Sequence, residues 1–141
     1  MRNRELAADY VRRAEIRIRA IQVLFDGSSW ADVVRESQEV VELALKGLLR
    51  ACGIEAPRIH DVSDVLLAAR ERLPPAARTE VDRLAAISRG LRRDRELAFY
   101  GAEDLTPSTF YSRDDATSAF EGARFVVNIV APAVRGESVR E

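Results

Sequence analysis

Apolar side chains recur every three or four residues through most of the chain, and this spacing constrains the fold more than any other feature. The first such segment forms one apolar stripe and ends before Asp26-Gly27. The stripe consists of Leu6, Tyr10, Ala14, Ile18, Ile21 and Phe25. We find no alternating apolar and polar run bounded by hairpin turns. The sequence therefore predicts an all-α fold, an antiparallel bundle of about five helices.

A second and a third helix are predicted from their terminal residues. The second begins near Ser29 and stops at Gly53, a residue type that commonly ends helices. Its apolar arc is wide, which is typical of a central helix. A short third helix begins at Asp61, and Asp64, three residues later, is expected to complete a capping box.

The fourth and fifth helices are predicted in the second half of the chain. The fourth runs from about Ala76 to Tyr100 and stops at Gly101. The fifth begins with a capping box made by Ser112 and Asp115. We expect it to end at Pro132, because proline cannot continue a regular helix.

The chain has 141 residues, which is the size of one domain. We expect a single helical domain over residues 1–134 and a frayed charged tail over residues 135–141. The 22 basic and 23 acidic side chains leave a net charge of -1. No global field therefore draws the protein to nucleic acid or to an anionic membrane, and any site for a polyanion has to be local.

Several other classes are excluded by what the sequence contains. Cys52 is the single cysteine, which excludes an internal disulfide and a CxxC metal cluster. The first twenty residues are rich in arginine and lack the apolar segment of a signal peptide. No apolar run is long enough to span a membrane. We expect a cytoplasmic protein without a metal, a cofactor or a membrane association.

The most unusual stretch lies late in the fourth predicted helix. Four arginines fall within seven residues, Arg89, Arg92, Arg93 and Arg95, and Tyr100 follows. One interpretation is structural, because arginines near a helix C-terminus compensate its dipole and pair with acidic neighbours. The other is a phosphate or RNA-backbone site, in which Arg93 and Tyr100 converge. The acidic neighbours available for pairing are Asp94, Glu96 and Asp104.

Two other polar features have ordinary structural explanations. Glu42, Lys46 and Arg50 form a ladder at four-residue spacing, which usually does no more than stabilise a solvated helix face. His60 is the only histidine and directly precedes the predicted cap at Asp61. A lone histidine at such a place is more often a hydrogen-bonded structural group than a general base. We find no spacing typical of a catalytic triad, a phosphate loop or a metal site.

Two apolar residues of the first helix lie off its main stripe. Ile16 and Val23 fall on the opposite, otherwise charged side. Single exposed aliphatic residues are ordinary on protein surfaces. A pair on one helix face nevertheless indicates a further contact, for which a second subunit is one candidate.

Three features in order along the chain together resemble the HEPN domain family. This family comprises small helical proteins of prokaryotes that are often encoded beside a minimal nucleotidyltransferase. The matching features are the segment Ser37–Leu49, which resembles the family's glutamate-then-lysine helix; Gly53, Pro57 and His60-Asp61, which resemble the entry to its short helix; and Arg93–Gly101, at the place of its active-site motif.

The resemblance implies a homodimer whose fourth helices line a shared cleft. Active members are metal-independent RNases, commonly toxins, and their motif contains an arginine, a polar residue, a histidine and often a tyrosine. Arg93, Asp94 and Tyr100 match this motif, but Ala98 stands at the histidine position. Alanine cannot transfer a proton, which argues against nuclease activity. In some members the tyrosine accepts AMP groups from the nucleotidyltransferase, so the resemblance makes Tyr100 a candidate modification site.

Three functions remain open from the sequence. The first is a dimeric, non-catalytic HEPN protein that binds a nucleotide, an RNA backbone or a partner through the arginines and Tyr100, with Arg89, Arg92, Arg93 and Arg95 as ligand-binding residues. It would form one half of a toxin–antitoxin type pair with a nucleotidyltransferase. The alternative is a metal-independent RNase toxin with Arg93, Asp94 and Tyr100 as catalytic residues. The third is a helical dimer without a ligand.

Overall fold

The computed structural model describes residues 2–55, 61–102 and 110–136, and it describes side chains over the same ranges except at residues 2 and 93–102. This part of the chain is helical and contains no strand, which confirms the all-α prediction. None of its helices has both the length and the apolar character that a membrane crossing requires. The elements are α1 (Arg2–Asp26), α2 (Trp30–Ala51), α3 (Val62–Ala68), a 3₁₀ turn η1 (Arg70–Arg72), α4 (Pro75–Thr79), α5 (Val81–Ala102) and α6 (Arg113–Arg135).

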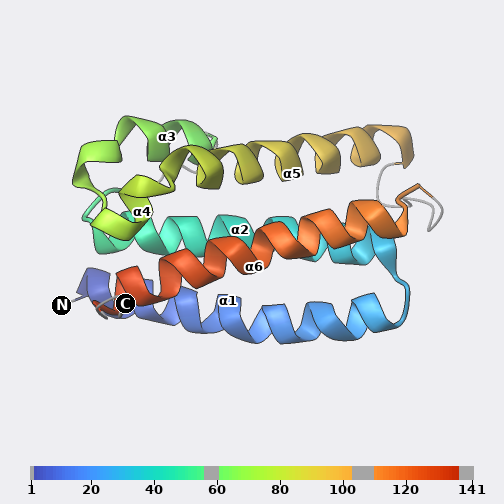
Figure 1. Ribbon diagram of the computed structural model, residues 1–141, viewed down its shortest axis with the longest axis horizontal. Helices are drawn as coiled ribbons and strands as arrows, with labels where there is room; N and C mark the ends of the chain where they lie inside the picture. The colour runs from blue at the N-terminus through green and yellow to red at the C-terminus, as the bar shows by residue number, and fades with distance from the viewer. Residues whose placement is uncertain (1, 56–60, 103–109, 137–141) are drawn as a thin grey trace.

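Helix α2 is the centre of the bundle (Figure 1). It packs against α1 and α6 along most of its length, and against α5 and α3 on its other side. α1 runs along the opposite edge of the molecule from α5. Eleven residues of α2 are buried, which confirms the expected wide inward arc. They are Val33, Val34, Ser37, Gln38, Val40, Val41, Ala44, Leu45, Gly47, Leu48 and Leu49.

The buried stripe of α1 differs in part from its prediction. Ala7 and Val11 are buried, whereas the expected Leu6 and Tyr10 are only half-buried. The reason lies in the contact with α2, where a Cβ on Gly47 would approach the Tyr10 Cβ to 3.2 Å. Tyr10 therefore lies at the boundary between α1 and α2, where its side chain is half-buried beside Gly47.

The fourth predicted helix is divided in two. α4 ends at Thr79, Glu80 has a φ of -103° and a ψ of 11°, and α5 begins at Val81. Ala77 and Val81, on either side of this break, are both fully buried. The bend at Glu80 lets each short segment turn an apolar side inward. α5 also continues past Gly101 to Ala102, so the expected stop at Gly101 is wrong.

The start of α6 matches its prediction and its end does not. Ser112 and Asp115 form a complete capping box, with the Asp115 amide donating to Ser112 Oγ at 3.1 Å. Pro132 does not stop the helix, which continues to Arg135 and is capped by Gly136 in a left-handed conformation. The carbonyl that Pro132 leaves unpaired belongs to the exposed Asn128, so water can reach it. The expected frayed tail lies, from residue 137 onward, outside the described residues.

Candidate functional site

Helix α5 carries the arginines that the sequence singles out. Its first half is fixed by buried apolar residues, among them Val81, Leu84 and Leu91, which face α2 and α3. Arg89 is exposed and Arg92 is half-buried, and both lie toward the start of α3. The described side chains of the site therefore begin at these two arginines.

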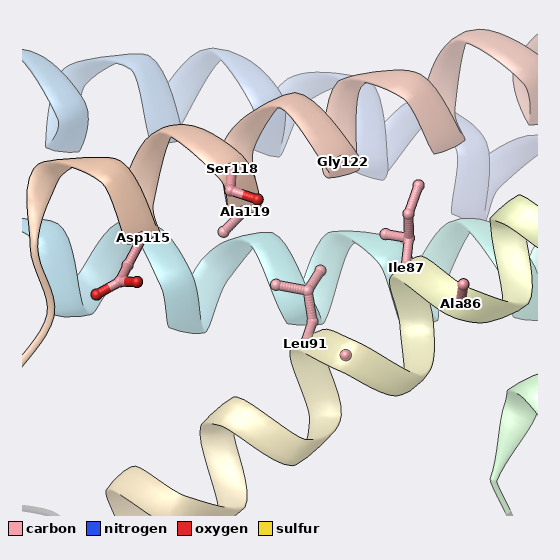
Figure 2. Close-up of a pocket in the computed structure, with 8 residues that line it drawn as sticks. Ala86, Ile87, Leu91, Asp115, Ser118, Ala119 and Gly122 are labelled. Carbon is pink, nitrogen blue, oxygen red and sulfur yellow. The ribbon is translucent and has the colours of Figure 1, made fainter.

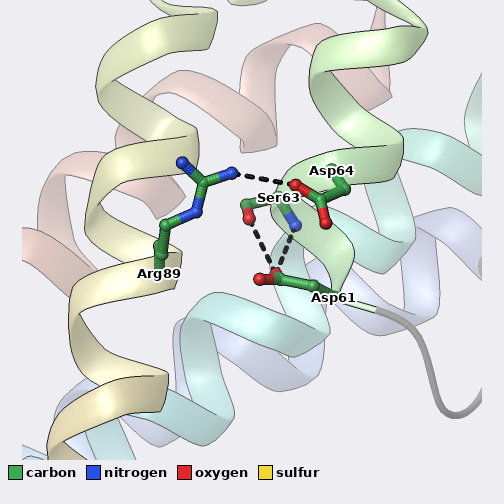
Figure 3. Close-up of polar contacts among 4 residues, drawn as sticks. All are labelled: Asp61, Ser63, Asp64 and Arg89. Carbon is green, nitrogen blue, oxygen red and sulfur yellow. Dashed lines mark hydrogen bonds and ion pairs between the residues drawn. The ribbon is translucent and has the colours of Figure 1, made fainter.

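Arg89 forms an ion pair with Asp64 of α3 (Figure 3). Its Nη2 lies 2.9 Å from Asp64 Oδ1, and both side chains are more than half exposed. Exposed pairs of this kind contribute about 0–1 kcal/mol to stability. Arg89 thus has an acidic partner, as the structural interpretation expects, but that partner comes from α3 rather than from the neighbouring turns of α5.

The ion pair also corrects the capping box predicted at the start of α3. Asp61 caps the helix by accepting hydrogen bonds at Oδ1 from the Ser63 amide at 2.9 Å and from Ser63 Oγ at 2.7 Å. Asp64 points to Arg89 and not back to the amide of Asp61 (Figure 3). An arginine across the helix interface offers a charged donor, which a backbone amide cannot match.

The pKa of Asp61 reflects the positive charge of the arginines of α5 near the start of α3. Burial alone would raise the pKa of Asp61. The hydrogen bonds from Ser63 and the charges of Arg92 and Arg89 outweigh that effect, and the pKa of Asp61 lies below its ordinary value. The charges of Arg89 and Arg92 therefore act together on Asp61, so both guanidiniums lie toward the start of α3.

The remaining predicted residues lie in the last part of α5. The backbone of Arg93, Asp94, Arg95, Ala98 and Tyr100 is helical, as expected. Their side chains lie outside the described residues. The convergence of Arg93 with Tyr100 stays a prediction.

A cleft of about 240 Å³ opens between α5 and α6, next to this basic segment (Figure 2). The two helices are close at one end, where a Cβ on Gly122 would lie 3.1 Å from Ile87 Cγ2. They diverge beyond this point, and a Cβ on Gly90 would have no atom within 4 Å. Leu91 and Ala119 form an apolar floor, and Asp115 and Ser118 lie along the α6 side.

Neither this cleft nor the contact at its narrow end is predicted by the sequence. Arg83 of α5 lies over the ring of Phe125 of α6, with its guanidinium carbon 3.8 Å from the ring centre. Such a cation–π contact fixes the two helices together at this point. Two glycines inside helices, Gly90 and Gly122, could have indicated a special contact between α5 and α6. Glycine is disfavoured in helix interiors, so its presence there often has a packing reason.

The other candidates for chemistry do not join this site. His60 lies outside the described residues. Burial raises the pKa of the Cys52 thiol, although Arg72 opposes the rise, so Cys52 is disfavoured as a thiolate nucleophile. Within the described ranges no ion pair joins Glu42, Lys46 and Arg50, and Arg50 donates to Asn3 Oδ1 at 3.3 Å instead.

The described residues form an all-helical bundle in which a short third helix begins at an aspartate cap and a run of arginines lies on α5. The family model of the HEPN domain matches residues 7–134, and the chain belongs to this family. The match spans all three sequence features that resemble the family. No curated protein and no solved structure matches the chain.

Proposed function

We propose that this HEPN protein binds the phosphate groups of a nucleotide or an RNA backbone through the second half of α5. The protein is a homodimer in this proposal, with the α5 helices of two subunits facing one shared cleft. It forms one half of a toxin–antitoxin type pair with a minimal nucleotidyltransferase, and Tyr100 is available for modification by that partner. The ligand-binding residues are Arg89, Arg92, Arg93, Arg95 and Tyr100.

The observation that carries the proposal is the excess of positive charge on α5. Four arginines stand between residues 89 and 95, with Asp94 as the one acidic residue among them. Among the described carboxylates, Asp64 pairs with Arg89, and the charges of Arg89 and Arg92 both act on Asp61. The Arg89–Asp64 pair is exposed, so a phosphate can compete for this guanidinium at little cost.

The divergence of α5 from α6 leaves space along the same stretch of α5, on its α6 side. Gly90 faces this space, because a Cβ there would have no atom within 4 Å. A glycine at such a position lets another backbone or a ligand approach the helix closely. The cleft therefore offers room for part of a ligand beside α5 within each subunit, although its described lining includes no arginine.

Binding of labelled single-stranded RNA and of ATP at increasing salt tests the proposal. Affinity should fall as salt rises, because condensed counterions are released on binding. Arg93→Ala should weaken RNA binding and reduce the salt slope by about one, as expected for the loss of one phosphate contact. Arg35→Ala on α2 is the matched control, because Arg35 is exposed and lies on another helix. Equal binding by wild type and Arg93→Ala would assign the arginines to a structural role.

The same preparation tests the RNase alternative, which the match of Arg93, Asp94 and Tyr100 to the motif favours. RNA cleavage without a metal needs a base and an acid, and one positioned proton-transfer group contributes about 10² to 10⁴ in rate. Wild type should cleave RNA slowly or not at all in the presence of a chelator, and Ala98→His should raise any activity. Robust wild-type cleavage that Arg93→Ala abolishes would establish the RNase and overturn the binding proposal.

A further inference from the structure

The outer face of α1 combines two exposed aliphatic side chains with three exposed arginines. Ile16 is 47% exposed and Val23 is 70% exposed, and they are two of the three large apolar side chains exposed in the described part of the chain. The central residues of the outer face are Arg12, Arg13, Ile16, Arg19, Ala20 and Val23, all of them exposed, and Asp9 and Asp26 lie at its two ends.

Contacts on both flanks of α1 hold this face toward solvent. On one flank Arg17 pairs with Glu36 of α2 at 3.6 Å. On the other flank Glu15 binds Arg135, and Gln22 accepts from Arg124 at 2.6 Å, both on α6. Ile16 lies between residues that reach in opposite directions, so its side chain points away from the bundle. Val23 lies two helical turns further on the same side.

The charges of this face are only partly compensated. Arg12 and Arg13 contact Asp9 at 3.6 and 4.0 Å, which are long distances for exposed pairs. No described hydrogen bond or ion pair engages Arg19, which lies between the two aliphatic residues. The centre of the face is therefore apolar and positive at once.

We infer that the outer face of α1 docks an acidic amphipathic helix of another protein. Apolar residues of that helix, spaced seven apart, would cover Ile16 and Val23, and carboxylates beside them would pair with Arg12 and Arg19. RNA fits this face poorly, because its bases stack on aromatic rings and the exposed apolar residues here are aliphatic.

A second copy of the chain also fits poorly, because the face is not complementary to itself. If Ile16 of each copy packs opposite Val23 of the other, the two helices are antiparallel and both Arg19 side chains lie beside the symmetry axis. A parallel arrangement places Arg19 opposite Arg19. Like charges at such positions oppose association. The acidic partner removes this conflict by pairing with Arg19.

A designed peptide provides the test. It is a helical peptide with leucines at i and i+7 and glutamates on both flanks of them, and its matched control carries lysines in place of the glutamates. The glutamate peptide should bind the full-length protein and the lysine peptide should not. Val23→Ser and Arg19→Glu should each weaken binding by about tenfold, because one removes an apolar anchor and the other reverses a charge. Arg35→Glu carries the same charge change on α2 and should bind like wild type.

Four results would overturn the inference. They are failure of the glutamate peptide to bind, equal binding of both peptides, a halved particle mass in light scattering for Val23→Ser, and binding to phosphatidylserine vesicles that Val23→Ser abolishes. The third would assign the face to a second copy and the fourth to a membrane surface. An unchanged thermal unfolding midpoint shows that each variant is folded. The face lies on α1 and the proposed phosphate site on α5, so each proposal can fail without the other.

Discussion

Helices α2 and α5 have the same length, 22 residues, and opposite roles in the molecule. α2 has neighbours on several sides and buries eleven residues. α5 is anchored over its first half by buried apolar residues, and its run of arginines begins at Arg89. The comparison shows how the apolar arc of a helix sets its place in the bundle: the helix with the wide arc lies at the centre, and the helix with the arginine run lies at the edge.

The largest expected effect compares one leucine from each helix. Leu48 of α2 is fully buried, whereas Leu91 of α5 is 6% exposed and lies on the floor of the cleft. Leu48→Ala should lower the free energy of unfolding by about 2–5 kcal/mol, the usual cost of a core cavity. Leu91→Ala should cost less, because its surroundings are open on one side. Urea unfolding measures both, and equal losses would show that α5 is as much a part of the core as α2.

A smaller effect is expected at the two glycines that line the cleft, Gly90 on α5 and Gly122 on α6. Gly90→Ala should stabilise the protein by about 0.4–1 kcal/mol, because the added methyl group meets no atom and alanine favours the helix. Gly122→Ala should gain less or lose stability, because its methyl group would lie 3.1 Å from Ile87. Thermal unfolding distinguishes the two. RNA binding weakened by Gly90→Ala, despite higher stability, would show that the cleft receives the ligand.

Local sequence signals predict the existence of the helices better than they predict where the helices end. The apolar spacing of α2 predicts its buried face because α2 has neighbours on several sides. The residues that recur with helical spacing are therefore the residues that pack against those neighbours. The spacing cannot show that the chain bends at Glu80, because both α4 and α5 continue an apolar pattern with helical period. The expected stop at Pro132 is wrong for a related reason. The rule that proline ends a helix is local, and it ignores the burial of Val134 and the Arg135–Glu15 ion pair beyond Pro132.

At the candidate site the sequence shows which side chains are charged, but it does not show which residues they contact. The run of arginines on α5 is plain in the sequence. The partner of Arg89 is Asp64, which lies 25 residues away and was assigned to a cap. Sequence spacing shows contacts within one helix, whereas this one forms between α3 and α5. The cleft cannot be predicted from sequence spacing either, because it depends on the angle between two helices.

A pH experiment measures how much the contact between α1 and α6 contributes to stability. This contact does not involve α5. The hydrogen bond from Arg135 outweighs desolvation and lowers the pKa of Glu15 below its ordinary value. The resulting stability is present above the unfolded-state pKa of about 4.3 and is lost as pH falls through the lower, folded-state value. Both side chains are about one-third exposed, so the contribution stays below about 1 kcal/mol. Glu15→Gln should flatten the acid side of the stability curve, and Arg135→Gln should do the same, with little added in the double variant.

The smallest expected effect on stability separates the two interpretations of the α5 arginines. Asp64→Asn removes the partner of Arg89 but keeps the guanidinium, whereas Arg89→Ala removes the guanidinium itself. Because the pair is exposed, each substitution should change the free energy of unfolding by less than about 1 kcal/mol. Their effects on RNA binding should be opposite: Arg89→Ala removes a positive charge and weakens binding, and Asp64→Asn frees Arg89, removes a competing carboxylate and strengthens it. A purely structural pair would leave the affinity unchanged in both variants and alter stability by similar amounts. Fluorescence anisotropy with one labelled RNA, at one salt concentration, is sufficient to compare the two variants with wild type.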